Sequence, residues 1–189
     1  MDHKTNDNKL WEDFKKGDKN ALSQIYSQHV DLLFRYGKKF KADSELIKDT
    51  IQDLFFDLIR TRSNLGTTDN IRFYLIKAFR RRLFRNLKKF GNLPTLVDES
   101  ELQAEIVYSV EEALICKEEL SHREQMIQQG LKKISPKQRE ILFYRFTCDF
   151  EYDQICEIMS LKYDSARKQV FRAITALKDK LPDKNYFLS

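Results

Sequence analysis

The spacing of the apolar residues constrains the fold of this chain most strongly, because it repeats with a helical period over most of the sequence. Between residues 18 and 40, one stripe is formed by Leu22, Ile25, Tyr26, Val30, Leu33 and Phe34. No stretch alternates apolar and polar residues as a half-buried strand would. Only five glycines and three prolines occur among the 189 residues, which favours long helices and few tight turns. We therefore predict an all-α fold.

Helix start and stop signals divide this pattern into separate elements. After a short helix that ends at Gly17, helices are expected over about 18–40, 43–62, 69–90, 109–133, 136–146, 151–159 and 164–178. The clearest start signal comes from Ser135 as N-cap, Pro136 at the first helical position and Gln138 completing a capping box.

Residues 91–112 differ in composition from the rest of the chain. They contain six acidic residues and no basic one, together with glycine, proline and weak periodicity. This composition predicts an acidic linker. We therefore expect two helical domains, residues 1–90 and residues 113–189, joined by that linker.

Composition also bears on the class of protein. The polar opening, MDHKTNDNKL, is unlike a signal peptide, and no apolar run approaches the roughly 20 residues that cross a bilayer. We expect a cytoplasmic protein without membrane insertion, in which Cys116, Cys148 and Cys156 are reduced.

The sequence contains no pattern typical of a catalytic site. The three histidines have no paired carboxylates, nucleophile or phosphate-binding glycine loop around them. Neither an enzyme nor a cofactor or metal site is therefore expected.

Basic charge is concentrated in one expected helix, although the net charge of the chain is only +5. Residues 70–90 hold eight basic side chains and no acidic one. Lys77, Arg81, Arg85 and Lys88 share one helical face, which favours contact with a polyanion. Interleaved aromatics, Phe73, Tyr74 and Phe84, suggest stacking on single-stranded bases. The alternative is a solvated basic face above core aromatics.

The expected helix 43–62 combines acidic and large apolar residues. Asp49, Gln52, Asp53 and Asp57 lie among Phe55, Phe56 and Ile59. This is more apolar surface than one core face needs, so a protein partner with basic residues is indicated. An ordinary core with solvated carboxylates is the alternative.

Residues 151–178 have the pattern of a helix-turn-helix. In the second helix, Ala166, Val170, Ala173, Ile174 and Leu177 form an inward arc, with Asp164 expected as N-cap. The polar side of this helix carries Ser165, Arg167, Lys168, Phe171 and Arg172, in the turns from which a recognition helix reaches base edges. An amphipathic helical hairpin without DNA is the alternative.

Four segments follow one another along the chain: FKKGDKNALSQIY, IKDTIQDLFFDLIRTRSNL, IRFYLIKAFRR and ISPKQREILFYRF. In this order they resemble segments of bacterial RNA polymerase sigma factors of the compact extracytoplasmic-function (ECF) class. The first resembles the opening helix of that family, and the second resembles its polymerase-binding signature. IRFYLIKAFRR resembles the helix that engages the upstream promoter element. ISPKQREILFYRF, followed by the helix-turn-helix, resembles the second promoter-binding domain. Ser160 stands where the family commonly has a turn glycine.

The resemblance implies a role in transcription initiation. Domain 1–90 would bind core RNA polymerase through Asp49, Gln52, Asp53 and Phe56. The same domain would recognise and melt the minus-ten element through Asn64, Asn70, Lys77, Arg81, Arg85 and Lys88. Domain 113–189 would read the minus-thirty-five element through the helix-turn-helix. An anti-sigma factor is a further implied partner.

The main alternative is a stand-alone helix-turn-helix regulator of transcription. Such a protein would explain residues 151–178, but it would leave the acidic aromatic helix and the basic helix 69–90 without a role.

Overall fold

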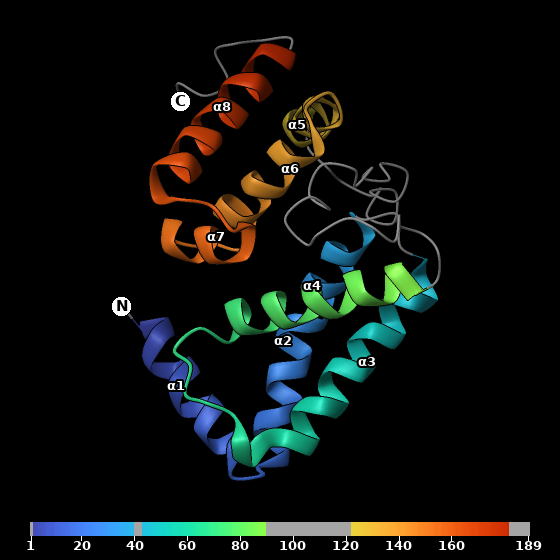
Figure 1. Ribbon diagram of the computed structural model, residues 1–189, viewed down its shortest axis with the longest axis vertical. Helices are drawn as coiled ribbons and strands as arrows, with labels where there is room; N and C mark the ends of the chain where they lie inside the picture. The colour runs from blue at the N-terminus through green and yellow to red at the C-terminus, as the bar shows by residue number, and fades with distance from the viewer. Residues whose placement is uncertain (1, 40–42, 90–121, 182–189) are drawn as a thin grey trace. The chain divides into compact units, whose positions relative to one another are not determined.

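The computed structural model describes residues 2–39, 43–89 and 122–181 (Figure 1). All regular elements in these ranges are helical, as the periodicity predicts, so the all-α fold is confirmed. The chain divides into two compact units, residues 1–96 and 97–189. The expected linker, 91–112, lies outside the described residues, as do Cys116 and the first part of the helix expected over 109–133. Within the described ranges, no helix is both long and apolar enough to cross a membrane.

The described part of the first unit, residues 2–39 and 43–89, consists of four α-helices and one short 3₁₀ turn. They are α1 (Asp2–Lys15), α2 (Lys19–Lys38), α3 (Ser44–Thr61), η1 (Arg62–Asn64) and α4 (Ile71–Lys89). The helices pack around fully buried aromatic side chains, among them Trp11, Tyr36 and Phe79. Burying an aromatic side chain of this size removes some 150–250 Å² from water, so these three contribute much of the core.

Two local features fix how α2 is placed. Gly17 adopts φ +94, and Asp18 then caps α2 by accepting hydrogen bonds from the backbone N–H groups of Asn20 and Ala21. Further along, a Cβ at Gly37 would lie 2.9 Å from two carbon atoms of Ile47 in α3. Glycine at position 37 therefore allows the close approach of α2 and α3.

The second unit begins with α5 (His122–Lys132) and α6 (Pro136–Leu142). The predicted start of α6 is confirmed: Ser135 accepts from the Gln138 N–H, and the Gln138 side chain accepts from the Ser135 N–H. The expected helix 136–146 is not regular throughout, because Phe143–Thr147 form a π-helical turn, η2. Inside the unit, the buried Tyr144 hydroxyl donates to the buried carboxylate of Glu140 at 2.7 Å.

A helix-turn-helix completes this unit, with α7 (Tyr152–Met159) and α8 (Tyr163–Lys180). Ser160 ends α7 in the left-handed conformation, φ 53 and ψ 46, and the Leu161 N–H donates to the Cys156 carbonyl. A turn glycine suits this position because an L-residue with a Cβ is strained there.

Two predicted helix starts were wrong by one or two residues. The N-cap of α8 is Lys162, whose carbonyl accepts from the Ala166 N–H, so Asp164 lies inside the first turn. An acidic residue in that turn interacts favourably with the helix dipole, which explains the capping-like signal. Helix α4 begins at Ile71 rather than at Asp69, because Asn70 accepts from the Phe73 N–H.

Candidate nucleic-acid and protein interfaces

The polar face of α8 is open to solvent. Arg167, Lys168 and Arg172 are exposed, and Phe171 is 71% exposed, whereas Ser165 is only partly exposed. The opposite face is buried through Ala166, Val170, Ala173 and Leu177. Burial of one face fixes the helix, so the cationic groups and the Phe171 ring project from it together. Arginine and lysine side chains suit phosphates and guanine edges, and a phenylalanine ring suits a thymine methyl group.

The first helix of the motif and the turn hold α8 in place. Ile155, Ile158 and Met159 form the buried side of α7, and the rings of Tyr152 and Tyr163 meet edge to face at 5.6 Å. Burial raises the pKa of the Cys156 thiol, helped by the nearby Asp153 carboxylate. A thiol that stays protonated is a poor nucleophile, which favours a packing role for Cys156.

On α3, the four residues predicted to bind polymerase lie on one face. Asp49, Gln52, Asp53 and Phe56 follow the helical spacing i, i+3, i+4 and i+7, and all four are exposed, Phe56 to 67%. Two further apolar side chains are exposed in the same unit, Ile59 on α3 and Tyr26 on α2. The Tyr26 ring packs edge to face on the buried Phe55 at 4.9 Å. An exposed aromatic with carboxylates around it is typical of a docking surface for a cationic protein.

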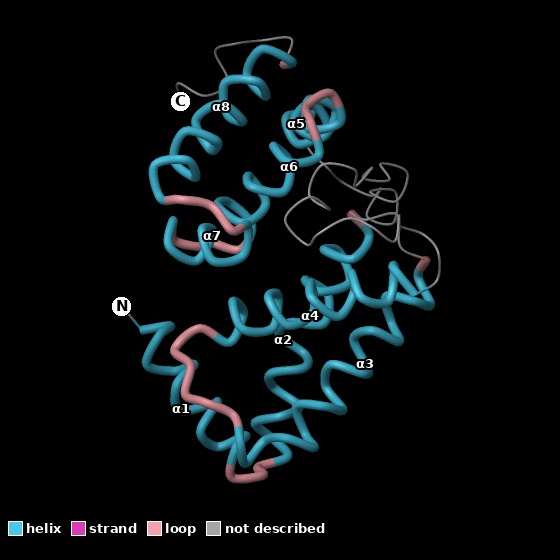
Figure 2. The backbone as a smooth tube through the Cα atoms, viewed as in Figure 1, coloured by secondary structure: helices cyan, strands magenta, loops and turns pink. Residues whose placement is uncertain are grey.

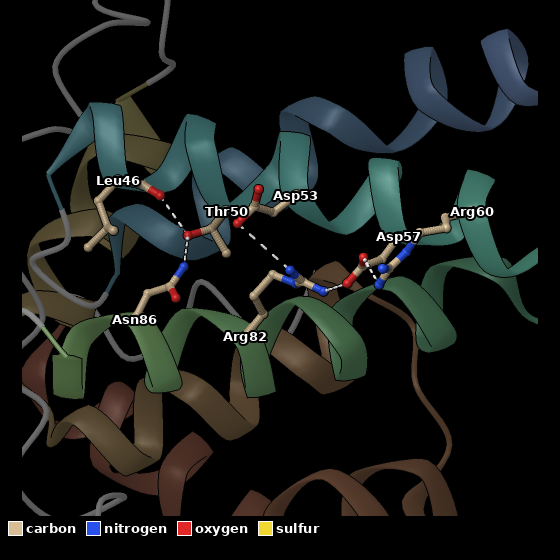
Figure 3. A network of polar contacts seen from close by, with 7 residues as sticks. All are labelled: Leu46, Thr50, Asp53, Asp57, Arg60, Arg82 and Asn86. Carbon is tan, nitrogen blue, oxygen red and sulfur yellow. Dashed lines mark hydrogen bonds and ion pairs between the residues drawn. The ribbon is translucent and has the colours of Figure 1, made fainter.

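A polar network joins α3 to α4, and sequence analysis did not identify it (Figure 3). Arg82 of α4 pairs with Asp57 and lies 3.7 Å from Asp53, while Asp57 also pairs with Arg60. The hydrogen bond from Arg82 lowers the pKa of the Asp57 carboxyl. Arg82 therefore faces α3 and is not part of the solvated basic face of α4.

The same interface has a second, neutral connection (Figure 3). The Asn86 side-chain amide donates to the Thr50 hydroxyl at 3.1 Å, and that hydroxyl donates to the Leu46 carbonyl at 2.6 Å. Thr50 is fully buried. Because an unpaired buried hydroxyl is costly, these bonds help to fix the register of α3 on α4.

The basic face of α4 has the arrangement expected from its period. Arg81 and Arg85 are exposed, and Lys77 and Lys88 are partly exposed. The face toward the core is buried through Leu75, Phe79, Leu83 and Leu87. The basic face could therefore track a phosphate backbone.

The aromatics of α4 do not form the stacking surface that the sequence suggested. Phe84 is only 4% exposed and lies under the Arg80 guanidinium, at 4.6 Å from the ring centroid. Tyr74 is half-buried, and its ring packs on Trp11 at 4.9 Å. Phe73 is also partly buried. The expectation of stacking was wrong for Phe84, because residues beside a basic stripe also face the core of this small unit.

The 3₁₀ turn η1 and the loop that joins it to α4 carry the two asparagines predicted to contact the minus-ten element. Asn64 is exposed at the end of η1. Asn70 has a structural role as well, since its side-chain oxygen accepts from the Phe73 N–H at 2.8 Å. The loop is also tied to α1 at both ends, by Trp11 bonded to the Gly66 carbonyl and by Asp7 bonded to the Ile71 N–H.

The described residues contain no group of three histidine, cysteine, aspartate or glutamate side chains that could hold a metal ion. His29 is buried in α2, and its pKa is lowered chiefly by burial and next by the charge of Arg72. A neutral histidine at this position is consistent with a packing role.

Comparison with known proteins gives one family match. Residues 124–177, from α5 into α8, match the family described as sigma-70, region 4. The matched range contains the whole of α7 and most of α8, and so nearly all of the helix-turn-helix. None of the curated protein sequences compared with the chain matches it.

Solved structures similar to the chain extend the likeness to both units. One is CnrH in complex with the cytosolic domain of CnrY, with 14% identity, a TM-score of 0.56, and coverage of 92% of this chain and 95% of that chain. Another is the sigma factor RpoE of Bartonella quintana in complex with the anti-sigma factor NepR. It has 18% identity and a TM-score of 0.53, over 82% of this chain and 95% of that chain. At these identities the likeness establishes a shared fold.

The likeness to these structures spans both units and is not restricted to the helix-turn-helix. Residues 124–177 match sigma-70, region 4, and the chain shares the fold of a solved sigma factor.

Proposed function

We propose that the two units divide promoter recognition between them. Residues 1–90 bind core RNA polymerase and the minus-ten element, and residues 113–189 bind the minus-thirty-five element. The observation that carries this proposal is the exposed cationic face of α8, set on a helix-turn-helix whose other face is buried. To contact base edges, a helix must be held in place and must project polar side chains. The buried face of α8 holds the helix, and its exposed face carries such side chains.

The α3 face is the proposed docking site for polymerase. Asp49, Gln52 and Asp53 would meet basic residues of the enzyme, and Phe56 would supply the apolar anchor. Anchors of this kind contribute most when they become fully buried in the complex. Because polymerase then holds the sigma factor near the promoter, weak contacts to two DNA elements suffice by effective concentration.

The basic face of α4 and the loop before it are the proposed contacts to the minus-ten element. Four basic side chains of α4 would lie along phosphates: Lys77, Arg81, Arg85 and Lys88. Asn64 and Asn70 come just before α4 in the sequence. Melting requires an unstacked base to be held outside the duplex, at a cost of a few kcal/mol. The end of η1 and the loop after it offer exposed polar groups for that purpose, including Asn64, Thr67 and Asp69.

Regulation by a protein inhibitor is part of the proposal. The two solved structures described above are complexes, and one of the partners is described as an anti-sigma factor. We propose a partner of the same kind for this chain, which would cover its exposed apolar and charged faces. The chain would act in the cytoplasm and leave phosphodiester chemistry to the polymerase.

Reconstituted transcription tests the proposal. Purified protein and core polymerase, without an inhibitor, should initiate from defined start sites on a genomic DNA library, whereas core enzyme alone should not. Mapping the starts would give the two promoter elements. Failure of the pure, folded protein to confer start-site selection would overturn the proposed function.

A further inference from the structure

The loop of residues 65–70, between η1 and α4, runs along α1 and is bonded to it at both ends (Figure 2). Near the first end, the Trp11 indole Nε1–H donates to the Gly66 carbonyl at 2.8 Å. At the other end, the Asp7 carboxylate accepts from the Ile71 N–H at 3.0 Å. These partners are 55 and 64 residues apart in the chain, so the attachment is tertiary.

The indole is itself held firmly. Trp11 is fully buried, and its ring contacts Phe14 at 5.3 Å and Tyr74 at 4.9 Å between centroids. By contrast, a Cβ added at Gly66 would meet no atom within 4 Å. The Cβ side of Gly66 is therefore open, and the hydrogen bond to its carbonyl ties this part of the loop to α1.

The second half of the loop is ordered by its own side chains. The Thr68 hydroxyl oxygen lies 3.2 Å from both the backbone nitrogen and the carbonyl oxygen of Asn70, and Asn70 then accepts from the Phe73 N–H. This turn continues directly into α4. The two attachments to α1 thus leave Thr67 and Asp69 exposed on a loop whose two ends are both fixed.

We propose that Trp11 and Asp7 are positioning residues for promoter recognition, which hold the 65–70 loop in the shape that receives an unstacked base of the minus-ten element. The inference rests on the proposed function, in which this loop contacts that element. A loop that is ordered before DNA arrives loses less conformational entropy on binding, and its polar groups keep one geometry. Trp11 and Asp7 need not touch DNA themselves.

Selection from a pool of promoter DNA tests this role. The pool carries a promoter mapped for the wild-type holoenzyme, randomised at each minus-ten position, and transcripts are sequenced after one round. Trp11→Phe keeps an aromatic ring but removes the Nε1–H donor. At one or more minus-ten positions, the variant should prefer the base selected by the wild type over the other bases roughly tenfold less strongly. This is the effect expected when one hydrogen bond that orders the site is removed.

Asp7 gives a matched pair of variants. Asp7→Ala removes the acceptor for the Ile71 N–H and should reduce the same preference, whereas Asp7→Asn keeps an oxygen at that position and should select like the wild type. Ile25→Val, which removes one buried methyl group from α2, controls for a general decrease in stability. A merely destabilised protein lowers the yield from all promoters alike and leaves the ratios between them unchanged.

The outcomes separate the two levels of the proposal. If wild-type and both Trp11→Phe and Asp7→Ala holoenzymes enrich the same sequences to the same degree, the positioning role is wrong while the proposed function stands. If the wild-type holoenzyme enriches no minus-ten sequence, the proposed function fails, and the positioning role fails with it.

Discussion

At the scale of single residues, Ser160 is under local strain. It occupies the left-handed region at the end of α7, where an L-residue costs about 1–2 kcal/mol, and glycine avoids the steric part of that cost. Ser160→Gly should stabilise the second unit by roughly 0.5–1 kcal/mol, because the greater freedom of unfolded glycine offsets part of the gain. Amide hydrogen exchange should slow in α7 and α8 and stay unchanged in α1 to α4.

Ser160→Val supplies the opposite control. A β-branched side chain is disfavoured at positive φ, so exchange in the second unit should become faster. Equal protection of the serine, glycine and valine forms would contradict the strained geometry.

Asp57 makes stability depend on pH. Its folded-state pKa is lowered by the hydrogen bond from Arg82, so its contribution is present at neutral pH. This contribution to stability is lost as the pH falls below about 4, the pKa of the carboxyl in the unfolded chain, and then through its lower pKa in the folded protein. Because the pair is partly exposed, Asp57→Asn should cost only about 0.5–1 kcal/mol at pH 7.

Urea unfolding of the wild type and Asp57→Asn at several pH values checks this expectation. The difference between the two proteins should narrow in acid and also in about 1 M salt. A difference that is the same at pH 7 and in strong acid would show that Asp57 acts by packing.

At the scale of elements, α8 and α3 should act on different partners. Replacing Lys168 and Arg172 with alanine should weaken binding of the holoenzyme to duplex promoter DNA, by about 1–3 kcal/mol for each of the two side chains that reaches a base edge. A plot of the logarithm of the binding constant against the logarithm of the salt concentration should also become shallower. Its slope should change by about one unit for each of the two side chains that contacts a phosphate. Fluorescence anisotropy with labelled DNA measures both quantities, and the affinity for core polymerase should not change.

Two variants complete that comparison. Lys180→Ala removes an exposed charge at the far end of α8 and should leave promoter binding nearly unchanged. Asp49→Ala with Asp53→Ala on α3 should weaken polymerase binding instead. Weaker polymerase binding by the Lys168 and Arg172 variant would contradict the proposed division between the two units.

At the scale of the whole molecule, efficient initiation should depend on the covalent link between the two units. The residues between α4 and α5 join two compact units that each have a buried core. Cutting the chain there with an inserted protease site should leave both cores folded, by circular dichroism. It should reduce initiation by about 10²–10⁴-fold at equal concentrations, because binding of the second unit is no longer intramolecular. Full activity of the cut protein would show that polymerase assembles the units independently.

Much of this architecture could be predicted from the sequence, because it depends on short-range patterns. The helical stripes indicated the all-α fold, and the Ser135 capping box predicted the start of α6 to the residue. The starts of α4 and α8 were misplaced by local capping, whereas the errors about side-chain surroundings came from long-range contacts. The partner of Arg82 lies 25 residues away on α3, and Phe84 is buried by packing that a charge pattern does not reveal. The ties from Asp7 and Trp11 to the 65–70 loop likewise join distant segments and have no local signal.

The position of Trp11 has a practical consequence, since the chain contains one tryptophan. Its indole nitrogen is bonded to the 65–70 loop, so a fluorine atom incorporated on that ring would give a single resonance beside the loop. Combined with unlabelled polymerase, such a probe would follow the loop through each stage of initiation, with no dye attached to the protein or to the DNA.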